Sequence, residues 1–277
     1  MSPASHPAAY IDAVIQNLEQ ANPLRETTLR AIIAALNLSP GSAGLDIGCG
    51  IGLQSLLLAE AIAPGGHVTC LDISAELLDY ARDKVRSSPL ADRISFEAGD
   101  LYDLPFPDNS FDWVWSADCA GYPTGDLLTA LNEIARVARP GGPVAILAWT
   151  SQQLLPGHSL LEARLNATCS AYAPLWRGTS PESHFMRALR WFTEAGLVEA
   201  RAQTFVGEVQ APLSTERRIA LTSLFEMLWG TASPEATEAD RLEYQRLCRA
   251  DSPDFILNLP EYYAFFTYTM FSGRASK

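Results

Sequence analysis

The sequence has a shortage of positive charge. It contains 20 Lys and Arg residues against 32 Asp and Glu residues, which gives a formal net charge of −12 over 277 residues. Proteins that bind DNA or RNA usually present a basic face, because neutralising phosphates supplies much of their affinity. We therefore expect no nucleic acid among the partners of this protein.

The cysteines also lack the spacing that is typical of a metal-binding site. No two cysteines are separated by two residues, and their number is odd: Cys49, Cys70, Cys119, Cys169 and Cys248. Structural zinc sites bring such cysteines in closely spaced pairs. We expect no metal site, and we expect reduced thiols that pack as small apolar groups.

Long apolar runs and a leader pattern are absent as well. The N-terminus has no basic start followed by an apolar stretch, so it does not read as a signal peptide. The longest uncharged run, Gly141–Leu161, is interrupted by prolines, glutamines and a glycine. That pattern predicts a strand followed by a loop and no membrane span. The expected location is the cytoplasm.

What the sequence does have is a substantial apolar content, 48% against 19% charged residues, which is enough to form a core. The first forty residues show apolar positions at helical spacing on both sides of Asn22-Pro23. We predict two helices there, separated at the proline, and assign residues 1–40 to an N-terminal helical lid.

From residue 41 onwards, short apolar strands alternate with helices. The predicted strands are Leu45–Ile47, His67–Leu71, Arg93–Glu97, Phe111–Trp115 and Val144–Trp149, and the helices are Leu53–Ile62, Ser74–Val85 and Asp126–Ala138. Alternation of this kind favours parallel pairing with right-handed crossovers, and hence a doubly wound α/β sheet. Later in the chain, we predict helices at 181–195, 214–230 and 235–250, and strands at 197–209 and 261–272.

The first strand leads into a glycine-rich turn, L-D-I-G-C-G-I-G at positions 45–52. Glycine lets the backbone turn tightly and lets a ligand approach it closely. The spacing is G-x-G-x-G followed by Leu53, so the third glycine of dinucleotide-binding enzymes is missing. Asp72 ends the second strand, where a carboxylate can accept hydrogen bonds from ribose hydroxyls. The alternative for Asp72 is a helix cap, a task that Ser74 already suits.

Further motifs follow in order. They are L-D-I-S at 71–74, G-D-L at 99–101, L-P-F-P-D-N-S-F-D at 104–112 and L-N-E-I-A-R-V-A-R-P-G-G at 131–142. The set resembles class I S-adenosylmethionine (SAM)-dependent methyltransferases, in the small-molecule branch that includes ubiquinone/menaquinone-type enzymes. The resemblance covers roughly residues 40–150. It implies a Rossmann-like, doubly wound sheet of seven strands, six parallel and the last antiparallel, and transfer of a methyl group from SAM to a small molecule.

The resemblance also implies a set of SAM-binding positions. Gly48, Cys49 and Gly50 would pass beneath the methionine part, and Asp46 would orient that loop and the amino group. Further positions would hold the ribose hydroxyls (Asp72), the adenine (Ile73, Asp100 and Leu101) and the methionine end (Ser116 and Ala117). Tyr10 could close over SAM, or it could be amphipathic packing. S-adenosylhomocysteine (SAH) would be the product.

In the same family fold, residues 41–277 form one methyltransferase domain. Residues 197–209 and 261–272 would be its sixth and seventh strands. Residues 151–180 and 210–260 would then be insertions that form a substrate lid with the N-terminal helices.

Catalysis is harder to predict, because the methyl group of SAM is already activated and positioning supplies much of the rate. A general base is needed only if the acceptor keeps a proton of high pKa. Candidates after the fourth and fifth strands are Asp118, Tyr122 and His158, with His184 as a weaker one. Each has an ordinary alternative, as a loop carboxylate, a solvated histidine or a packing residue.

Aromatic residues are frequent in the expected lid regions: Tyr172, Trp176, Phe185, Trp191, Phe192, Phe225, Trp229, Tyr262 and Tyr263. They could line an apolar or aromatic acceptor pocket, or they could form the core between helices and sheet. Two other functions stay open at this point, a nicotinamide-dependent oxidoreductase and a non-catalytic SAM-binding protein. The identity of the acceptor and the oligomeric state are not determined by the sequence.

Overall fold

A computed structural model describes residues 8–122, 126–167, 182, 184–230 and 236–276 of the chain. Its centre is one seven-stranded sheet in the order β3-β2-β1-β4-β5-β7-β6. The strands are β1 (Ala43–Ile47), β2 (His67–Asp72), β3 (Ile94–Ala98), β4 (Trp113–Ala117), β5 (Pro143–Gln153), β6 (Val198–Gln210) and β7 (Tyr263–Arg274). Only β7 runs antiparallel to its neighbours. The predicted doubly wound sheet, with six parallel strands and an antiparallel last one, is confirmed.

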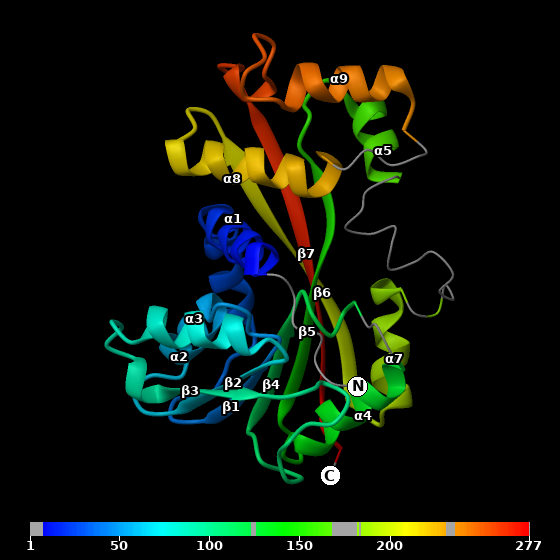
Figure 1. The fold of residues 1–277 in the computed structure, drawn as a ribbon. Coiled ribbons are helices and arrows are strands. Elements are labelled where there is room, and N and C mark those ends of the chain that lie inside the picture. Colours follow the sequence, from blue (N-terminus) through cyan, green and yellow to red (C-terminus); the bar gives the residue numbers. More distant parts are fainter. Residues whose placement is uncertain (1–7, 123–125, 168–181, 183, 231–235, 277) are drawn as a thin grey trace.

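Helices cover both faces of this sheet (Figure 1). On one face lie α1 (Ala8–Ala35), α2 (Leu53–Ala61) and α3 (Ala75–Val85), and on the other lie α4 (Leu127–Val137) and α7 (Ala188–Glu194). Short 3-10 turns occur at Ala91–Arg93 and Phe185–Arg187. Each face has its own hydrophobic cluster, one including Ile32, Leu58 and Trp115, the other including Ile134 and Phe192. Strands buried on both sides explain the near-continuous apolar runs of the sequence.

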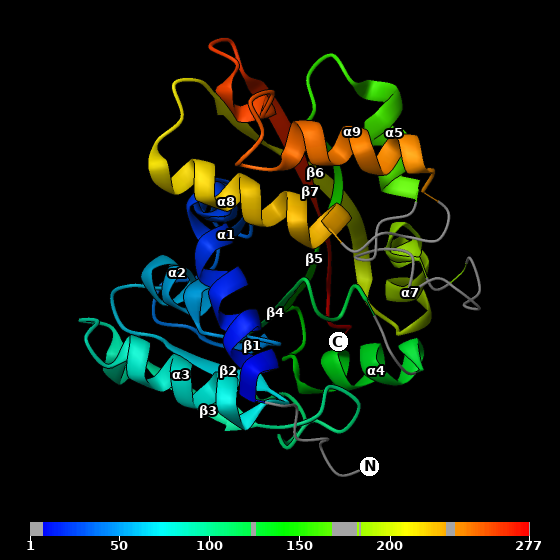
Figure 2. The ribbon, with the colours of Figure 1, turned by 45° about the horizontal axis from the view of Figure 1, so that its top comes forward.

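The last three strands of the sheet extend beyond the others. Strands β5, β6 and β7 have 11, 13 and 12 residues, whereas β1 to β4 have five or six. Their extra length carries a helical layer, visible at the top of Figure 1 and closer to the viewer in Figure 2. Its helices are α5 (Ser159–Ala167), α8 (Thr215–Phe225), the π-helix η4 (Glu226–Gly230), α9 (Glu238–Cys248) and the 3-10 turn η5 (Ile256–Asn258).

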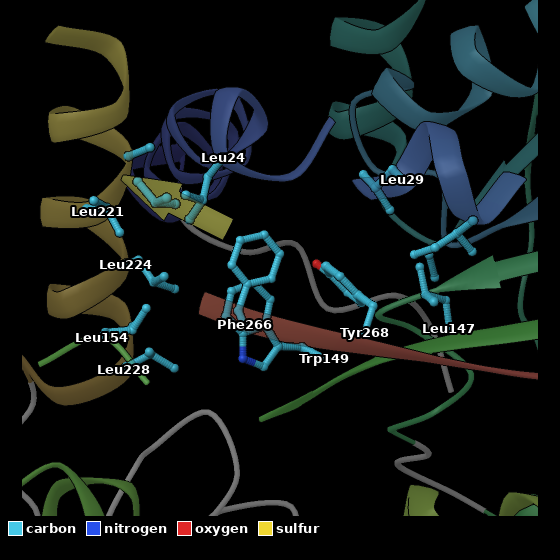
Figure 3. Packing of buried hydrophobic residues seen from close by; sticks show 14 of the residues in the cluster. Leu24, Leu29, Leu147, Trp149, Leu154, Leu221, Leu224, Leu228, Phe266 and Tyr268 are labelled. Atoms are coloured by element: carbon cyan, nitrogen blue, oxygen red, sulfur yellow. The ribbon is translucent and has the colours of Figure 1, made fainter. Parts of the chain in front are cut away.

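Aromatic stacking joins this extension to the sheet. The rings of Trp149 and Phe266 stack at 4.5 Å with an angle of 8°, and Tyr268 meets Trp149 edge-on (Figure 3). Leucines of α1 and α8, among them Leu24, Leu221 and Leu224, lie around the same group. The insertion predicted at 210–260 is therefore packed onto the sheet by a continuous core. Part of the other insertion, residues 168–180, lies outside the described residues.

The N-terminal prediction of two helices is wrong. The structure has a single helix, α1, which continues through Pro23. An internal proline removes a helix hydrogen bond and costs about 3 kcal/mol. On the C-terminal side of the proline, Leu24, Leu29 and Ile32 are buried, and α1 packs against α8, β6 and α2. Tertiary burial of the apolar stripe outweighs the local preference of proline.

Other element boundaries differ from prediction as well, and two of them are informative. The fourth strand begins at Trp113 and not at Phe111, because Phe111 pairs its backbone with the end of α4 at Val137 and Arg139. The helix predicted at 181–195 is shorter: it consists of the 3-10 turn followed by α7, and Pro181 lies outside the described residues. Within the described ranges, no helix combines the length and apolar character needed to cross a membrane.

Candidate active site

The glycine-rich turn forms an open cradle at the carboxyl end of β1. Gly48 and Gly50 have φ values of 73° and 54°, which favour glycine, and the amides of Gly48 and Cys49 donate to Leu71 O at 2.8 and 3.1 Å. A β carbon on Gly48 would lie 2.5 Å from the Cβ and Sγ atoms of Cys119. The turn therefore has a fixed shape that a larger side chain would break.

Asp72 lies against this turn from the end of β2. One carboxylate oxygen accepts from Gly50 N at 2.8 Å, and the other accepts from Ser74 N at 3.0 Å. The cap of α3 is formed by the Ser74 hydroxyl, which accepts from Leu77 N at 3.2 Å. Each carboxylate oxygen can accept two hydrogen bonds, so both oxygens of Asp72 retain acceptor capacity.

Two further side chains, Ile73 and Asp100, lie at the same edge of the sheet as Asp72. Ile73 leaves 59% of its surface exposed, which is unusual for an isoleucine in this fold. Asp100 is exposed at the end of β3, where its carboxylate accepts from Tyr102 N at 3.0 Å, and Leu101 next to it is half-buried. Since Asp72 and Ala98 are paired in neighbouring parallel strands, these groups share one edge of the sheet.

Asp46 lies beneath the cradle and is 2% exposed. The Ser55 hydroxyl donates to its carboxylate at 2.6 Å, which joins β1 to α2. Burial raises the pKa of Asp46 to about 7, although the hydrogen bond from Ser55 opposes the shift. The structure thus places this carboxylate below the loop, in contact with α2.

The end of β4 is held against the same loop. The Ser116 hydroxyl donates to Ile47 O at 3.0 Å and accepts from Ala120 N at 3.1 Å, and Ala117 beside it is buried. The pKa of the Cys49 thiol is raised through its hydrogen bond with Cys70, and burial raises the pKa of Cys119 to about 12. Both thiols are neutral packing groups at pH 7.

Helix α1 crosses over the cradle. A β carbon on Gly50 would lie 3.4 Å from Leu18 Cδ1. The neighbouring Glu19 accepts from Lys84 Nζ and from the Tyr80 hydroxyl of α3, both at 2.7 Å. Tyr10, near the start of α1, is 52% exposed. The N-terminal helix therefore covers the loop that the sequence identified.

Asp118, directly after β4, is the centre of a polar group that the sequence did not predict. The backbone of Asp118 is in the left-handed region, with a φ of 51°. One carboxylate oxygen accepts from Arg25 Nη1 at 3.2 Å and from the Tyr268 hydroxyl at 3.0 Å, and the other accepts from Trp149 N at 3.3 Å. Burial raises the pKa of Asp118, and the positive charge of Arg25 opposes the shift.

Arg25 and Tyr268 were missed because no local signal marks them. They lie 93 and 150 residues from Asp118 along the chain, and Tyr268 looked like one more aromatic residue in a strand. Only the pairing of β7 with β5 brings its hydroxyl to the carboxyl end of β4.

The structure does not bring the other catalytic candidates to this group. The Tyr122 hydroxyl donates to Trp149 O at 3.1 Å, and its ring packs on Phe185 over the opposite face of the sheet. His158 lies in the helical extension, where Nδ1 is 3.8 Å from Glu243 of α9. His184 accepts from Met186 N at the start of a 3-10 turn.

Most of the aromatic residues proposed for a pocket form core. Six of them are at most 5% exposed: Phe185, Trp191, Phe192, Phe225, Trp229 and Tyr262. Tyr263 is 45% exposed, and Tyr172 and Trp176 lie outside the described residues. For those six residues, the packing interpretation is correct.

The edge described above suits a nucleoside with a charged amino-acid tail. It offers the backbone of a glycine-rich turn, a carboxylate with free acceptor capacity for a diol, and an exposed aliphatic side chain for a flat ring. These properties fit SAM. In the part of the chain that the structure describes, no three His, Cys, Asp or Glu residues gather as metal ligands.

The known proteins that this chain resembles include methyltransferases, which agrees with a SAM site. The profile of a family described as a methyltransferase domain matches residues 45–142. Demethylmenaquinone methyltransferase of Symbiobacterium thermophilum is 31% identical over 229 residues, covering 75% of this chain and 91% of that protein. The enzyme of that name from Staphylococcus aureus is 30% identical over 194 residues, 66% of this chain and 78% of its own. A putative methyltransferase of Haloferax volcanii, solved with a methyltransferase activator, has a TM-score of 0.59 at 20% identity, covering 99% and 100% of the chains.

Proposed function

This chain belongs to the class I SAM-dependent methyltransferases, and we propose that its acceptor is a quinone-type small molecule in its reduced, hydroxyl-bearing form. The observation that carries the proposal is the extent of the similarity. The match to the Symbiobacterium protein covers 229 residues, well beyond the 45–142 range of the domain profile, so it includes chain on the acceptor side of the fold. An oxidoreductase using a nicotinamide is not favoured, since the family profile and these relatives are all methyltransferases.

For the cofactor, the geometry supports the following roles. Gly48, Cys49 and Gly50 present backbone to the methionine part of SAM, because the two glycines carry no side chain and have positive φ values that suit the tight turn. Asp72 accepts from the ribose hydroxyls with the lone pairs that Gly50 N and Ser74 N leave unused.

The adenine would lie between the next two groups along the edge. Ile73 offers its exposed side chain to the ring, and Asp100 with the Leu101 backbone lies opposite. Ser116 and Ala117 are proposed at the methionine end, where they fix the position of β4 against β1. Asp46 supports the loop through Ser55.

SAM supplies a methyl group that its sulfonium has already activated. The contribution of the chain is to hold the acceptor in line, to exclude water and to accept a proton. Asp118 is the proposed proton acceptor, because 28% of its side chain is open and burial raises its pKa. Tyr122 and His158 lack this placement.

A cover for the acceptor would come from three segments. We propose that α1 within residues 1–40, the segment 151–180 and the helices of 210–260 close over the site. Support comes from α1, which lies on the glycine loop and packs along α8. Tyr10, at the exposed start of α1, is then placed to move with this cover.

The proposal is tested first by calorimetric titration with SAM and SAH. We expect dissociation constants in the micromolar range, about −8 kcal/mol. Asp72→Ala should weaken binding at least tenfold, while Asp79→Ala, a 77% exposed carboxylate on the adjoining helix, should not. The acceptor class is tested by anaerobic incubation with a reduced naphthoquinone and SAM, followed by mass spectrometry. SAM binding without methylation of any reduced quinone would reject the acceptor class and leave the cofactor assignment intact.

A further inference from the structure

Only some of the hydrogen-bond donors of the Arg25 guanidinium have an acceptor among the described residues. Its Nη1 atom donates to Asp118 at 3.2 Å and to the Tyr268 hydroxyl at 3.1 Å, and 15% of the side chain is exposed. Among the residues that the structure describes, none accepts from Nε, which is fully buried, or from Nη2. A guanidinium carries five N–H donors, and the two on Nη2 can bind an anionic oxygen. The Arg25 side chain thus has donors without protein acceptors.

Three strands hold this guanidinium in place. Asp118 is fixed by its own amide, which donates to Leu147 O at 2.9 Å, and by the amide of Trp149. Tyr268 is completely buried, and its ring packs edge-on against Trp149. Figure 3 shows the Tyr268 side chain beside those of Phe266 and Trp149. The cation is therefore positioned by rigid elements and does not depend on a loose surface contact.

The sheet order places the cation relative to the nucleoside end of the site. The glycine turn, Asp72 and Asp100 lie at the ends of β1, β2 and β3, on one side of β4. Tyr268 lies on β7, which is separated from β4 by β5 on the opposite side. Arg25 is thus placed beyond Asp118, away from the nucleoside end of the site and over the strands where the acceptor is expected.

Resting on the proposed function, we propose that Arg25 binds an acidic hydroxyl oxygen on an aromatic acceptor and favours its ionised form. Asp118 takes the proton, and Tyr268 is a positioning residue that orients both charged groups. The acceptor class is thereby narrowed to aromatic rings with a phenol-like hydroxyl next to the methylated position.

In the proposed step, the acceptor hydroxyl loses its proton to Asp118. The O–H bond of the acceptor breaks, and the proton goes to the carboxylate oxygen of Asp118 that, among the described residues, accepts from Trp149 N alone, at 3.3 Å. The electron pair stays on the acceptor oxygen, beside Nη2 of Arg25. The second oxygen of Asp118 keeps its hydrogen bonds from Arg25 and Tyr268 throughout. Electron density on the ionised oxygen and on the adjoining ring carbon makes both better nucleophiles.

The test measures ionisation of a bound probe and needs no turnover. The probe is 4-methoxy-1-naphthol, which has one ionisable hydroxyl and absorbs at longer wavelength when ionised. It is titrated with pH in the presence of the wild-type protein saturated with SAH. We expect its pKa to fall by at least one unit on binding, which is a tenfold shift of its ionisation equilibrium. With Arg25→Met the shift should disappear and naphthol affinity should fall at least tenfold, while SAH affinity stays within about twofold.

Three further variants and one control ligand separate this role from a structural one. Arg30→Met lies on the same helix and removes an exposed cation paired with Glu26 and Glu60, so it should leave the naphthol unchanged. The double variant R25M/D118N removes both charges and so avoids an unpaired carboxylate. Tyr268→Phe keeps the ring and should reduce the pKa shift of the naphthol while SAH binding is retained. As a matched ligand, 1,4-dimethoxynaphthalene has no ionisable hydroxyl and should bind wild type and R25M equally.

The outcomes are distinct. An unshifted naphthol pKa, an equal shift in R25M, or no binding of the naphthol to the wild-type complex with SAH would each overturn the role of Arg25. Failure of the folded wild type to bind SAH would overturn the proposed function itself, and this inference with it.

Discussion

Cys119 lies directly against Gly48: a β carbon on the glycine would be 2.5 Å from both Cβ and Sγ of the cysteine. The contact joins the loop after β4 to the loop after β1, and these are the two segments that would face the methyl donor. Gly48 also has a positive φ of 73°. Space and backbone conformation therefore both demand glycine at this position.

Gly48→Ala should accordingly destroy the cofactor site. We expect SAH affinity to fall at least a hundredfold, about 2.7 kcal/mol, because the turn must open to admit the methyl group. Gly157→Ala is the matched control, since that glycine also has a positive φ but no atom lies within 4 Å of its β carbon position. It should lose about 1–2 kcal/mol of stability and keep SAH binding. Equal loss of affinity in both variants would contradict this account of Gly48.

Because the pKa of Asp46 is raised, we expect the free energy of unfolding to fall as pH rises. Burial raises its pKa to about 7, above its ordinary value of 3.8. Between these two values the folded state binds a proton that the unfolded state has lost, so the free energy of unfolding decreases with increasing pH. Asp46→Asn should remove this dependence, up to about 1.4 kcal/mol per pH unit. Urea denaturation of both proteins at pH 5, 6, 7 and 8 checks it, and parallel pH profiles would contradict a raised pKa.

Phe266 should carry much of the stability of the extension. Its ring is completely buried, stacks on Trp149 and fills the space above Gly207 of β6. Phe266→Ala should cost about 3–5 kcal/mol of unfolding free energy. Tyr263→Ala, three residues earlier in β7 and 45% exposed, should change it by about 0.5 kcal/mol. Chemical denaturation measures both, and similar values for the two would show that the stack is not the cause.

The contact of Glu19 with Lys84 and Tyr80 should hold α1 over the cradle. Both charged side chains are partly exposed, 39% and 30%, so we expect Lys84→Met to change unfolding free energy by less than about 1 kcal/mol. The dissociation rate of SAH should nevertheless rise roughly 2- to 5-fold, in keeping with a pair of that strength. Arg82→Met, two residues earlier on α3 in an exposed pair with Asp79, serves as control. Stopped-flow measurement with unchanged rates in K84M would argue against a closing role for this contact.

The positions proposed for the cofactor could be located in the sequence because their signals are local. The turn at 45–52, the carboxylate that ends β2 and the motif after β3 each occupy a few adjacent residues. Strand and helix alternation then placed them at one edge, since parallel strands bring their carboxyl ends together. The prediction failed for α1, where a proline suggested a break and burial of Leu24 and Leu29 kept the helix intact.

By itself, the sequence determined the alternation of strands and helices, the glycine turn and the resemblance to a family, because hydrophobic periodicity and short motifs are properties of neighbouring residues. The antiparallel last strand followed from that resemblance and not from the pattern of residues. Only the tertiary structure decided that Arg25, Asp118 and Tyr268 meet, and that Tyr122 and His158 do not join them. The reason is physical: that meeting depends on the path of α1 across the sheet and on the register of β7 against β5. Hydrogen bonds between residues so far apart in the chain leave no local pattern to read.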